Sequence, residues 1–286
     1  MPGGRRSESF VTPEPDLSAV SPYPDHYSVE LLRDLLEDRC NRYNRPHFIA
    51  EDPIALPHRF HRREDIEIAG FFAATLAWGR RSTILASGRR LLFLMDDAPS
   101  DFIRLASPRE LERLSTFTHR TFNGTDTRFF VLALRRLYLE EGGLSGFMAR
   151  HCPTDVPDTG IALAALHAWF FAQPDAPTRS RRHLSDPSRG SAAKRLSMFL
   201  RWMVRRDDRG VDFGLWLAPS PQQLICPLDV HTARISRHLG LLHRKSNDWK
   251  AAQELTASLR QFDALDPVRF DFALFGLGVY ERGIFL

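Results

Sequence analysis

Apolar residues recur at helical spacing along nearly all of the chain after residue 27. Ser28 precedes a stretch in which Leu31, Leu32, Leu35 and Leu36 repeat at this spacing, and a serine in that place caps a helix well. Alternating apolar and polar positions, which would indicate strands, are almost absent. The pattern therefore predicts an all-α protein.

The most apolar helix is predicted between Arg63 and Gly79, and its apolar residues run almost all round, as in a central, buried helix. A second, amphipathic helix is expected from Ser82 to Met95. The segment Ser107-Pro108-Arg109-Glu110 has the pattern of a capping box with proline at the first helical position. Further helices are expected over 125–140, 158–171, 191–206, 229–239, 248–261 and 266–278.

Two segments lack this periodicity. Residues 1–26 are rich in proline, serine, glycine and charge, which predicts a disordered tail. Residues 178–190 are polar and basic, which predicts an exposed loop or a boundary. We find no internal repeat, and we expect residues 27–286 to form a single helical domain with two lobes.

Composition and charge narrow the function only a little. The chain has 286 residues, of which 43% are hydrophobic, so it can bury a large core. Its formal net charge of +4 is modest, but the positive charge is nearly all arginine, which makes planar, bidentate contacts to phosphate. High-GC coding produces the same bias, so the bias alone decides nothing.

The three cysteines, at positions 40, 152 and 226, form no C-x-x-C pair, so neither a zinc site nor a disulfide framework is predicted. No apolar run reaches membrane length, and the N-terminus lacks a secretory pattern. We expect a cytoplasmic monomer that needs no metal or cofactor and has no membrane partner.

Lys194 and Asp229 are the candidate chemical pair. Lys194 follows a turn that opens a helix, and Asp229 follows a proline-containing loop at the start of another helix. An amine beside a carboxylate can attack a sugar carbon while the carboxylate stabilises the cation that forms. The simpler interpretations are that Asp229 only caps its helix and that Lys194 is an exposed helical residue. Lys194 is nevertheless one of only three lysines, and arginine cannot form a Schiff base.

The stretch 228–241 resembles a signature of the helix-hairpin-helix DNA glycosylase superfamily, the endonuclease III kind. That signature has an aspartate at a helix start, then a histidine, an arginine and an apolar residue two, five and six positions on. These match at Asp229, His231, Arg234 and Ile235, and Pro227 fits the loop before the aspartate. The resemblance implies a two-lobed helical fold, with His231 and Arg234 supporting a catalytic pair of Lys194 and Asp229.

The lysine of that superfamily follows a hairpin with glycines four and two positions before it. Gly190 matches the first, whereas Ala192 replaces the second. The spacing of 35 residues between Lys194 and Asp229 is longer than in endonuclease III and is similar to that of archaeal 8-oxoguanine glycosylases. No cysteine follows Cys226, which excludes the iron–sulfur cluster of some members on ligand count.

Over residues 28–286 the chain also resembles a mainly bacterial family catalogued as domain of unknown function 2400. The blocks that carry this likeness are 52–60, 76–81, 119–124 and 194–205. The likeness implies a fold and no activity, so any function has to come from the glycosylase signature.

The leading hypothesis is a DNA glycosylase with AP-lyase activity, in which Lys194 attacks C1′ of a nucleotide extruded from the duplex and Asp229 stabilises the positive charge. Lys194 and Asp229 should then face one cleft. DNA phosphates would be bound around the hairpin-like turn and on one helix face, by Arg189, Gly190, Ser191, Arg195, Arg80 and Arg81. Trp78, Phe122 and Trp202 could stack on a base or lie in the core.

The sequence is also compatible with two other functions. One is a non-catalytic nucleic-acid-binding protein on the same scaffold. The other is an enzyme that acts on modified RNA bases or nucleosides with the same pair.

Overall fold

The computed structural model describes residues 28–173 and 175–281, so the tail predicted for residues 1–26 lies outside the described part. Within that part helices dominate, and the strands form a single antiparallel pair, β1 (Thr118–His119) with β2 (Phe122–Asn123). The all-α prediction is confirmed. No helix in the described ranges is both long and apolar enough to cross a membrane.

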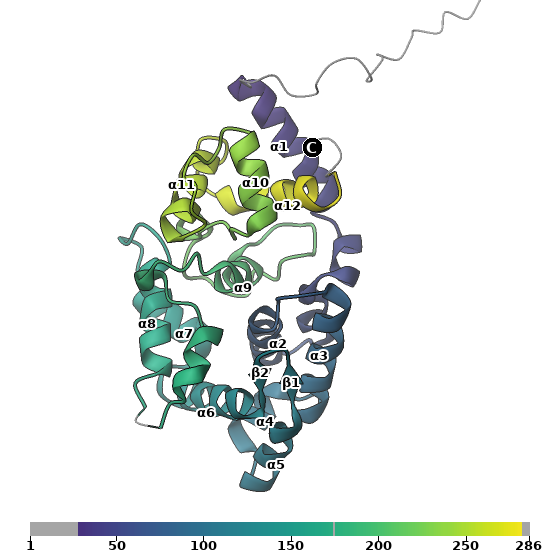
Figure 1. Ribbon diagram of the computed structural model, residues 1–286, viewed down its shortest axis with the longest axis vertical. Coiled ribbons are helices and arrows are strands. Elements are labelled where there is room, and N and C mark those ends of the chain that lie inside the picture. Colours follow the sequence, from purple (N-terminus) through teal and green to yellow (C-terminus); the bar gives the residue numbers. More distant parts are fainter. Residues whose placement is uncertain (1–27, 174, 282–286) are drawn as a thin grey trace, which may run out of the picture.

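The helices gather in two lobes with one helix between them (Figure 1). The lower lobe holds seven helices: α2 (Arg63–Thr75), α3 (Arg81–Leu94), α4 (Pro99–Leu105), α5 (Pro108–Arg113), α6 (Gly124–Glu140), α7 (Gly143–His151) and α8 (Gly160–Phe170). The upper lobe holds α1 (Val29–Tyr43), α10 (Val230–His238), α11 (Trp249–Arg260) and α12 (Asp271–Val279). Helix α9 (Lys194–Val204) lies between the two lobes.

The first helix of the described chain packs against the last one. Helix α1 packs on α12, and at Gly276 any Cβ would overlap the ring of Tyr43. The glycine therefore allows close packing of the two helices. As a result α1 belongs to the upper lobe, although the helices that follow it in the sequence, α2 to α8, form the lower lobe.

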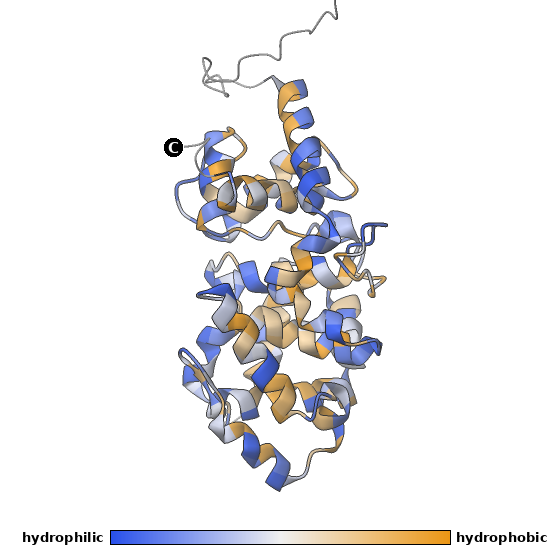
Figure 2. Cartoon of the chain, turned by 90° about the vertical axis from the view of Figure 1, so that its right-hand side faces the viewer, coloured by the Kyte–Doolittle hydropathy of each residue, from blue (hydrophilic) through white to orange (hydrophobic). Residues whose placement is uncertain are grey.

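Helix α2 is the central helix of the lower lobe, as its sequence predicts. Ile68, Phe71 and Phe72 are at most 2% exposed, and Gly70 lets the side chains of Phe199 and Met203 on α9 approach the helix closely. Figure 2 shows the hydrophobic residues concentrated in the middle of this lobe, with hydrophilic residues on its outer turns. Packing of α2 on α9 thereby ties the middle helix to the lower lobe.

Several local predictions can be compared directly with the structure. The capping box at Ser107 and Glu110 is formed. The segment 178–190 is not simply an exposed loop, because it winds into two 3-10 turns, Thr178–His183 and Pro187–Arg189, and buries Ser180 and His183. The helix expected over 191–206 begins at Lys194 instead, after Ala193 takes a left-handed conformation with φ of 48°.

Candidate functional site

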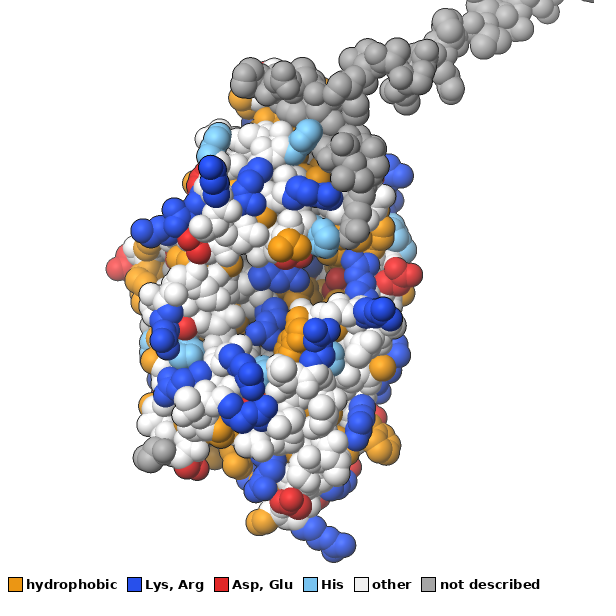
Figure 3. Space-filling model, viewed as in Figure 1, with side chains coloured by type: hydrophobic (Ala, Val, Ile, Leu, Met, Phe, Trp, Pro, Cys, Tyr) orange, Lys and Arg blue, Asp and Glu red, His pale blue; other side chains and the backbone are white. Residues whose placement is uncertain are grey.

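A cavity of about 600 Å³ lies between the two lobes. Its walls come from α9, from the starts of α3 and α10, from α12 and from the segment before α2. Figure 3 shows a hollow in the middle of one face, at the height at which Figure 1 shows α9, with Lys and Arg side chains around it. Aromatic, basic and acidic side chains all contribute to its lining, among them Phe48, Asp52, Trp78, Arg81, Lys194, Arg195, Met198, Arg201, Asp229, His231, Asp271 and Phe275.

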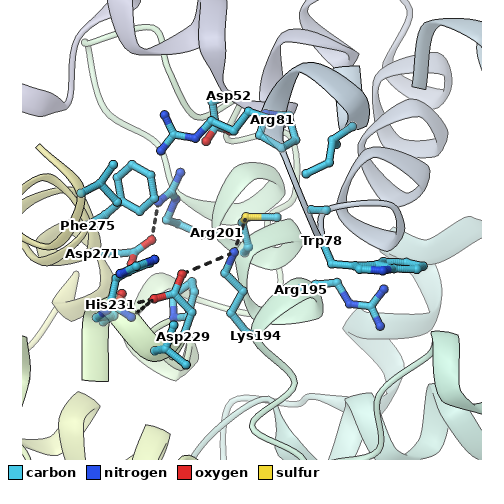
Figure 4. A pocket seen from close by; sticks show the side chains of 18 of the residues that line it. Asp52, Trp78, Arg81, Lys194, Arg195, Arg201, Asp229, His231, Asp271 and Phe275 are labelled. Carbon is cyan, nitrogen blue, oxygen red and sulfur yellow. Dashed lines mark hydrogen bonds and ion pairs between the residues drawn. The ribbon is translucent and has the colours of Figure 1, made fainter. Parts of the chain in front are cut away.

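Lys194 and Asp229 meet in this cavity (Figure 4). Lys194 is the first residue of α9, and its Nζ lies 3.9 Å from Oδ2 of Asp229 and 3.7 Å from Sδ of Met198. The two side chains are 29% and 24% exposed, so they are accessible from the cavity without being fully solvated. The prediction that the pair faces one cleft is confirmed.

The start of α10 holds Asp229 in place. Oδ1 of Asp229 accepts hydrogen bonds from the backbone amides of His231 and Thr232 at 2.8 and 2.9 Å, which makes Asp229 the N-cap of that helix. Its other oxygen, Oδ2, faces Lys194. The capping role and the pairing role therefore occur together, one on each oxygen.

The hairpin-like turn before Lys194 does not offer the amides that were expected to bind phosphate. The Gly190 amide donates to the Pro187 carbonyl at 2.9 Å, and the Ser191 amide donates to the Asp186 carbonyl at 3.3 Å. The prediction for these two amides is wrong, because the 3-10 turn over 187–189 already uses both. Arg189 is exposed beside the turn, and its contact with phosphate stays a prediction.

Arg195 lines the cavity from the start of α9. Its guanidinium donates to the carbonyls of Thr75 and His183 and lies 5.0 Å from the ring centre of Trp78. Burial without a carboxylate partner lowers the pKa of Arg195 to about 10. Two carbonyls and an indole thus hold its guanidinium at the cavity wall, and its contact with DNA phosphate stays a prediction.

Trp78 forms a fixed aromatic wall of the cavity. His183 stacks on the indole with ring centres 5.7 Å apart, and His119 packs edge-on at 5.1 Å. The two other aromatic residues considered for base stacking, Phe122 and Trp202, are fully buried and belong to the core. Of the three, only Trp78 lines the cavity.

Asp271 and Arg201 also line the cavity, and Figure 4 shows them joined to each other beside the Lys194–Asp229 pair. Neither was identified as a site residue from the sequence. Arg201 is 4% exposed and forms ion pairs with Asp271 and with Asp212. Burial raises the pKa of Asp271 to about 6, although Arg201 and Lys194 oppose the rise. The sequence did contain a signal for Arg201, because positions 194, 198 and 201 share one face of a helix and should face the same side as Lys194.

Arg205 follows α9 as its C-cap; it is buried and forms ion pairs with Asp207, Asp212 and Asp266 at 2.7 to 2.8 Å. These carboxylates raise the pKa of Arg205 against the opposing effect of burial. The segment 205–216, which lengthens the spacing between Lys194 and Asp229, is therefore fixed by an ionic network at the back of the cavity wall.

Of the two residues expected to support the pair, His231 reaches the cavity and Arg234 does not. His231 lines the cavity, and its backbone amide orients Asp229. Arg234 does not line it, and among the described residues its buried Nε and Nη2 atoms have no hydrogen-bond partner. Its supporting role stays a prediction. Arg81 lines the cavity from α3, whereas Arg80 is exposed just before that helix.

In residues 28–173 and 175–281, no group of three His, Cys, Asp or Glu side chains is arranged to hold a metal ion. The fold and the site thus define an all-helical protein with a lysine–carboxylate pair in an inter-lobe cavity. Residues 52–280 match the family described as protein of unknown function (DUF2400), and the chain belongs to that family. No curated protein and no solved structure matches the chain.

Proposed function

We propose that this protein is a DNA glycosylase with AP-lyase activity. The observation that carries the proposal is the 3.9 Å contact between Nζ of Lys194 and Oδ2 of Asp229 inside a cavity of about 600 Å³. A cavity of this size lies within the range that proteins use for small ligands, and an extruded nucleotide would present its sugar to both groups.

The proposed reaction begins with attack of Lys194 on the sugar and ends with release of the cleaved strand. Lys194 first loses its ammonium proton to water, and the neutral amine then bonds to C1′ of the sugar as the glycosidic C1′–N bond breaks. The departing base takes up a proton that the new C1′–NH₂⁺ group gives up. Oδ2 of Asp229 stabilises the positive charge that develops on the sugar. Opening of the sugar ring yields a Schiff base, loss of a C2′ proton expels the 3′ phosphate, and water then releases the lysine.

The charge around the cavity supports a polyanionic substrate. Figure 3 shows Lys and Arg side chains on both sides of the hollow, with acidic side chains mostly nearer the edges of that face. Arg189 and Arg80 are exposed, and Arg81 lies at the cavity wall. Phosphates on either side of an extruded nucleotide would be bound by such side chains.

The test is reductive trapping with borohydride, which links a Schiff-base enzyme covalently to its DNA. Wild-type protein is incubated with duplexes that carry an abasic site or one of a panel of oxidised, deaminated or alkylated bases. Lys194→Gln is compared with Lys245→Gln and Lys250→Gln, which remove the other two lysines, both exposed. We expect trapping in the wild type and in both control variants and none in Lys194→Gln.

Peptide mapping of the trapped complex adds a readout that does not depend on rates, because the adduct must lie on Lys194. An adduct on Lys245 or Lys250 would refute the assigned nucleophile. DNA binding without any trapping would favour a non-catalytic nucleic-acid-binding protein. Reaction only with RNA or free nucleosides would favour an enzyme that acts on modified RNA bases or nucleosides.

A further inference from the structure

Asp52 lies on the cavity wall across from Lys194 and Asp229, beside Arg81 (Figure 4). It is 8% exposed, and its Oδ1 accepts a hydrogen bond of 3.0 Å from the backbone amide of Ile54, which caps the 3-10 turn Pro53–Ala55. Among the described residues, no donor reaches its Oδ2 and no basic side chain forms an ion pair with it. One oxygen of a buried carboxylate thus faces the cavity without a partner.

An oxygen in this place favours a ligand donor, because leaving it unpaired when a ligand displaces the cavity water would be costly. Burial raises the pKa of Asp52, while the positive charges of Arg201, Lys194 and Arg81 favour its ionised form. A ligand donor in the cavity would supply the missing hydrogen bond. The position therefore favours a ligand that presents an N–H or O–H group to this wall.

The neighbouring side chains restrict the shape of that ligand. Phe48, Trp78 and Phe275 line the same cavity, and aromatic walls of this kind bind flat rings. A flat ring with polar N–H groups on its edge is the chemistry of a nucleobase.

We propose that Asp52 accepts a hydrogen bond from an N–H group of the base in this cavity and so selects bases with such a donor on that edge. The inference rests on the proposed function and names the class of base that the site takes. Sites built to pair with a ligand N–H or O–H reject analogues that lack it far more strongly than apolar pockets reject a change of size.

Asp52→Asn tests the polarity of this contact. Because the Ile54 amide requires an acceptor, the asparagine places its oxygen there and turns its NH₂ group into the cavity. The substitution thereby replaces an acceptor by a donor with almost no change in shape. Asp158→Asn is the control for burial and capping, because Asp158 is also 8% exposed and accepts a hydrogen bond of 2.7 Å from the Gly160 amide outside this cavity. Its Oδ2 is already paired, with Gln253 at 2.7 Å.

The first measurement is binding of free bases by NMR saturation transfer. The probes are 1-methyluracil against 1,3-dimethyluracil and 9-methylhypoxanthine against 1,9-dimethylhypoxanthine; each pair differs by the methyl group that removes the last N–H. Wild type and Asp158→Asn should bind the N–H form of at least one pair about 10- to 100-fold more tightly, as for a hydrogen bond to a charged group. Asp52→Asn should lose that preference. Equal preference in Asp52→Asn and wild type, or none in wild type, would overturn the inference.

The second measurement separates this inference from the proposed function. An abasic-site duplex has no base for Asp52 to contact, so Asp52→Asn should be trapped on it by borohydride as efficiently as wild type. Absence of trapping in the wild type would refute the lyase mechanism. The base-binding measurement would then still test the role of Asp52 independently. Trapping that is lost only in Asp52→Asn would show that Asp52 acts on the sugar and would refute its role as a base contact.

Discussion

Asp229 and Asp248 offer a matched pair of perturbations. Both are helix N-caps with nearly the same backbone conformation, φ −111° and ψ −176° for Asp229 and φ −116° and ψ −176° for Asp248. Each also forms an ion pair, Asp229 with Lys194 at 3.9 Å and Asp248 with Arg244 at 2.7 Å. They differ in that only Asp229 lines the cavity. Replacing either aspartate by alanine therefore removes a helix cap and an ion pair, but only the Asp229 variant changes the cavity.

The expected loss of stability follows from these contacts. Removing an aspartate N-cap costs about 0.5–2 kcal/mol, and a partly exposed ion pair contributes about 0.2–1 kcal/mol. We expect both alanine variants to lower the free energy of unfolding, Asp229→Ala by about 1–2 kcal/mol. Only Asp229→Ala should also slow base release, by about 10²- to 10³-fold, as for removal of one electrostatic stabiliser of a transition state.

The assay combines two measurements on the same preparations. Urea denaturation gives the free energy of unfolding, and single-turnover base release at saturating protein gives the rate without a contribution from weaker DNA binding. A second Asp229 variant, Asp229→Asn, keeps the cap and removes the charge, so it should retain most of the stability and lose the rate. If Asp229→Asn and Asp248→Ala release base at the same rate, Asp229 is only a helix cap and the site assignment is wrong.

Three further predictions concern packing and charge. Arg201→Met leaves Asp271 buried without its cation, so the free energy of unfolding should fall by about 3–5 kcal/mol, which denaturation would reveal; a loss near zero would contradict the buried pairing. Gly276→Ala drives a methyl group into the ring of Tyr43 and should lower the free energy of unfolding by about 1–3 kcal/mol, whereas an unchanged denaturation midpoint would mean that α1 moves freely. Arg189→Gln should reduce the salt dependence of DNA binding by about 0.9 in log–log slope, measured by fluorescence anisotropy, and an unchanged slope would exclude a phosphate contact.

The sequence predicts the helices well because helical periodicity is a local property. The capping box at Ser107 and Glu110 and the buried central helix α2 follow from a few neighbouring residues each. The pairing of Lys194 with Asp229 was also predictable, because each stands in a recognisable setting at a helix start. What the sequence missed locally was turn geometry, since the 3-10 turn over 187–189 uses the amides of Gly190 and Ser191.

The rest of the cavity depends on packing between distant segments. Asp52 belongs to a 3-10 turn before α2, and Asp271 begins a helix of the other lobe. Nothing in the neighbourhood of either aspartate in the sequence indicates that both face the same cavity as Lys194. Their positions follow from the close approach of α1 to α12 and of α2 to α9, which small residues at 276 and 70 permit.

Helix α9 explains why the accessible amine lies where it does. Lys194 and Arg201 lie on one face of this helix and Arg205 is its C-cap, which gives three cations in three different environments. The two arginines are buried and neutralised by carboxylates, whereas Lys194, at the cavity end, is 29% exposed and has a looser contact at 3.9 Å. Buried charges must be paired, so the arginines are committed to structure. Lys194 alone of the three can exchange its partner for a substrate, and it is also the only one whose chemistry allows a Schiff base.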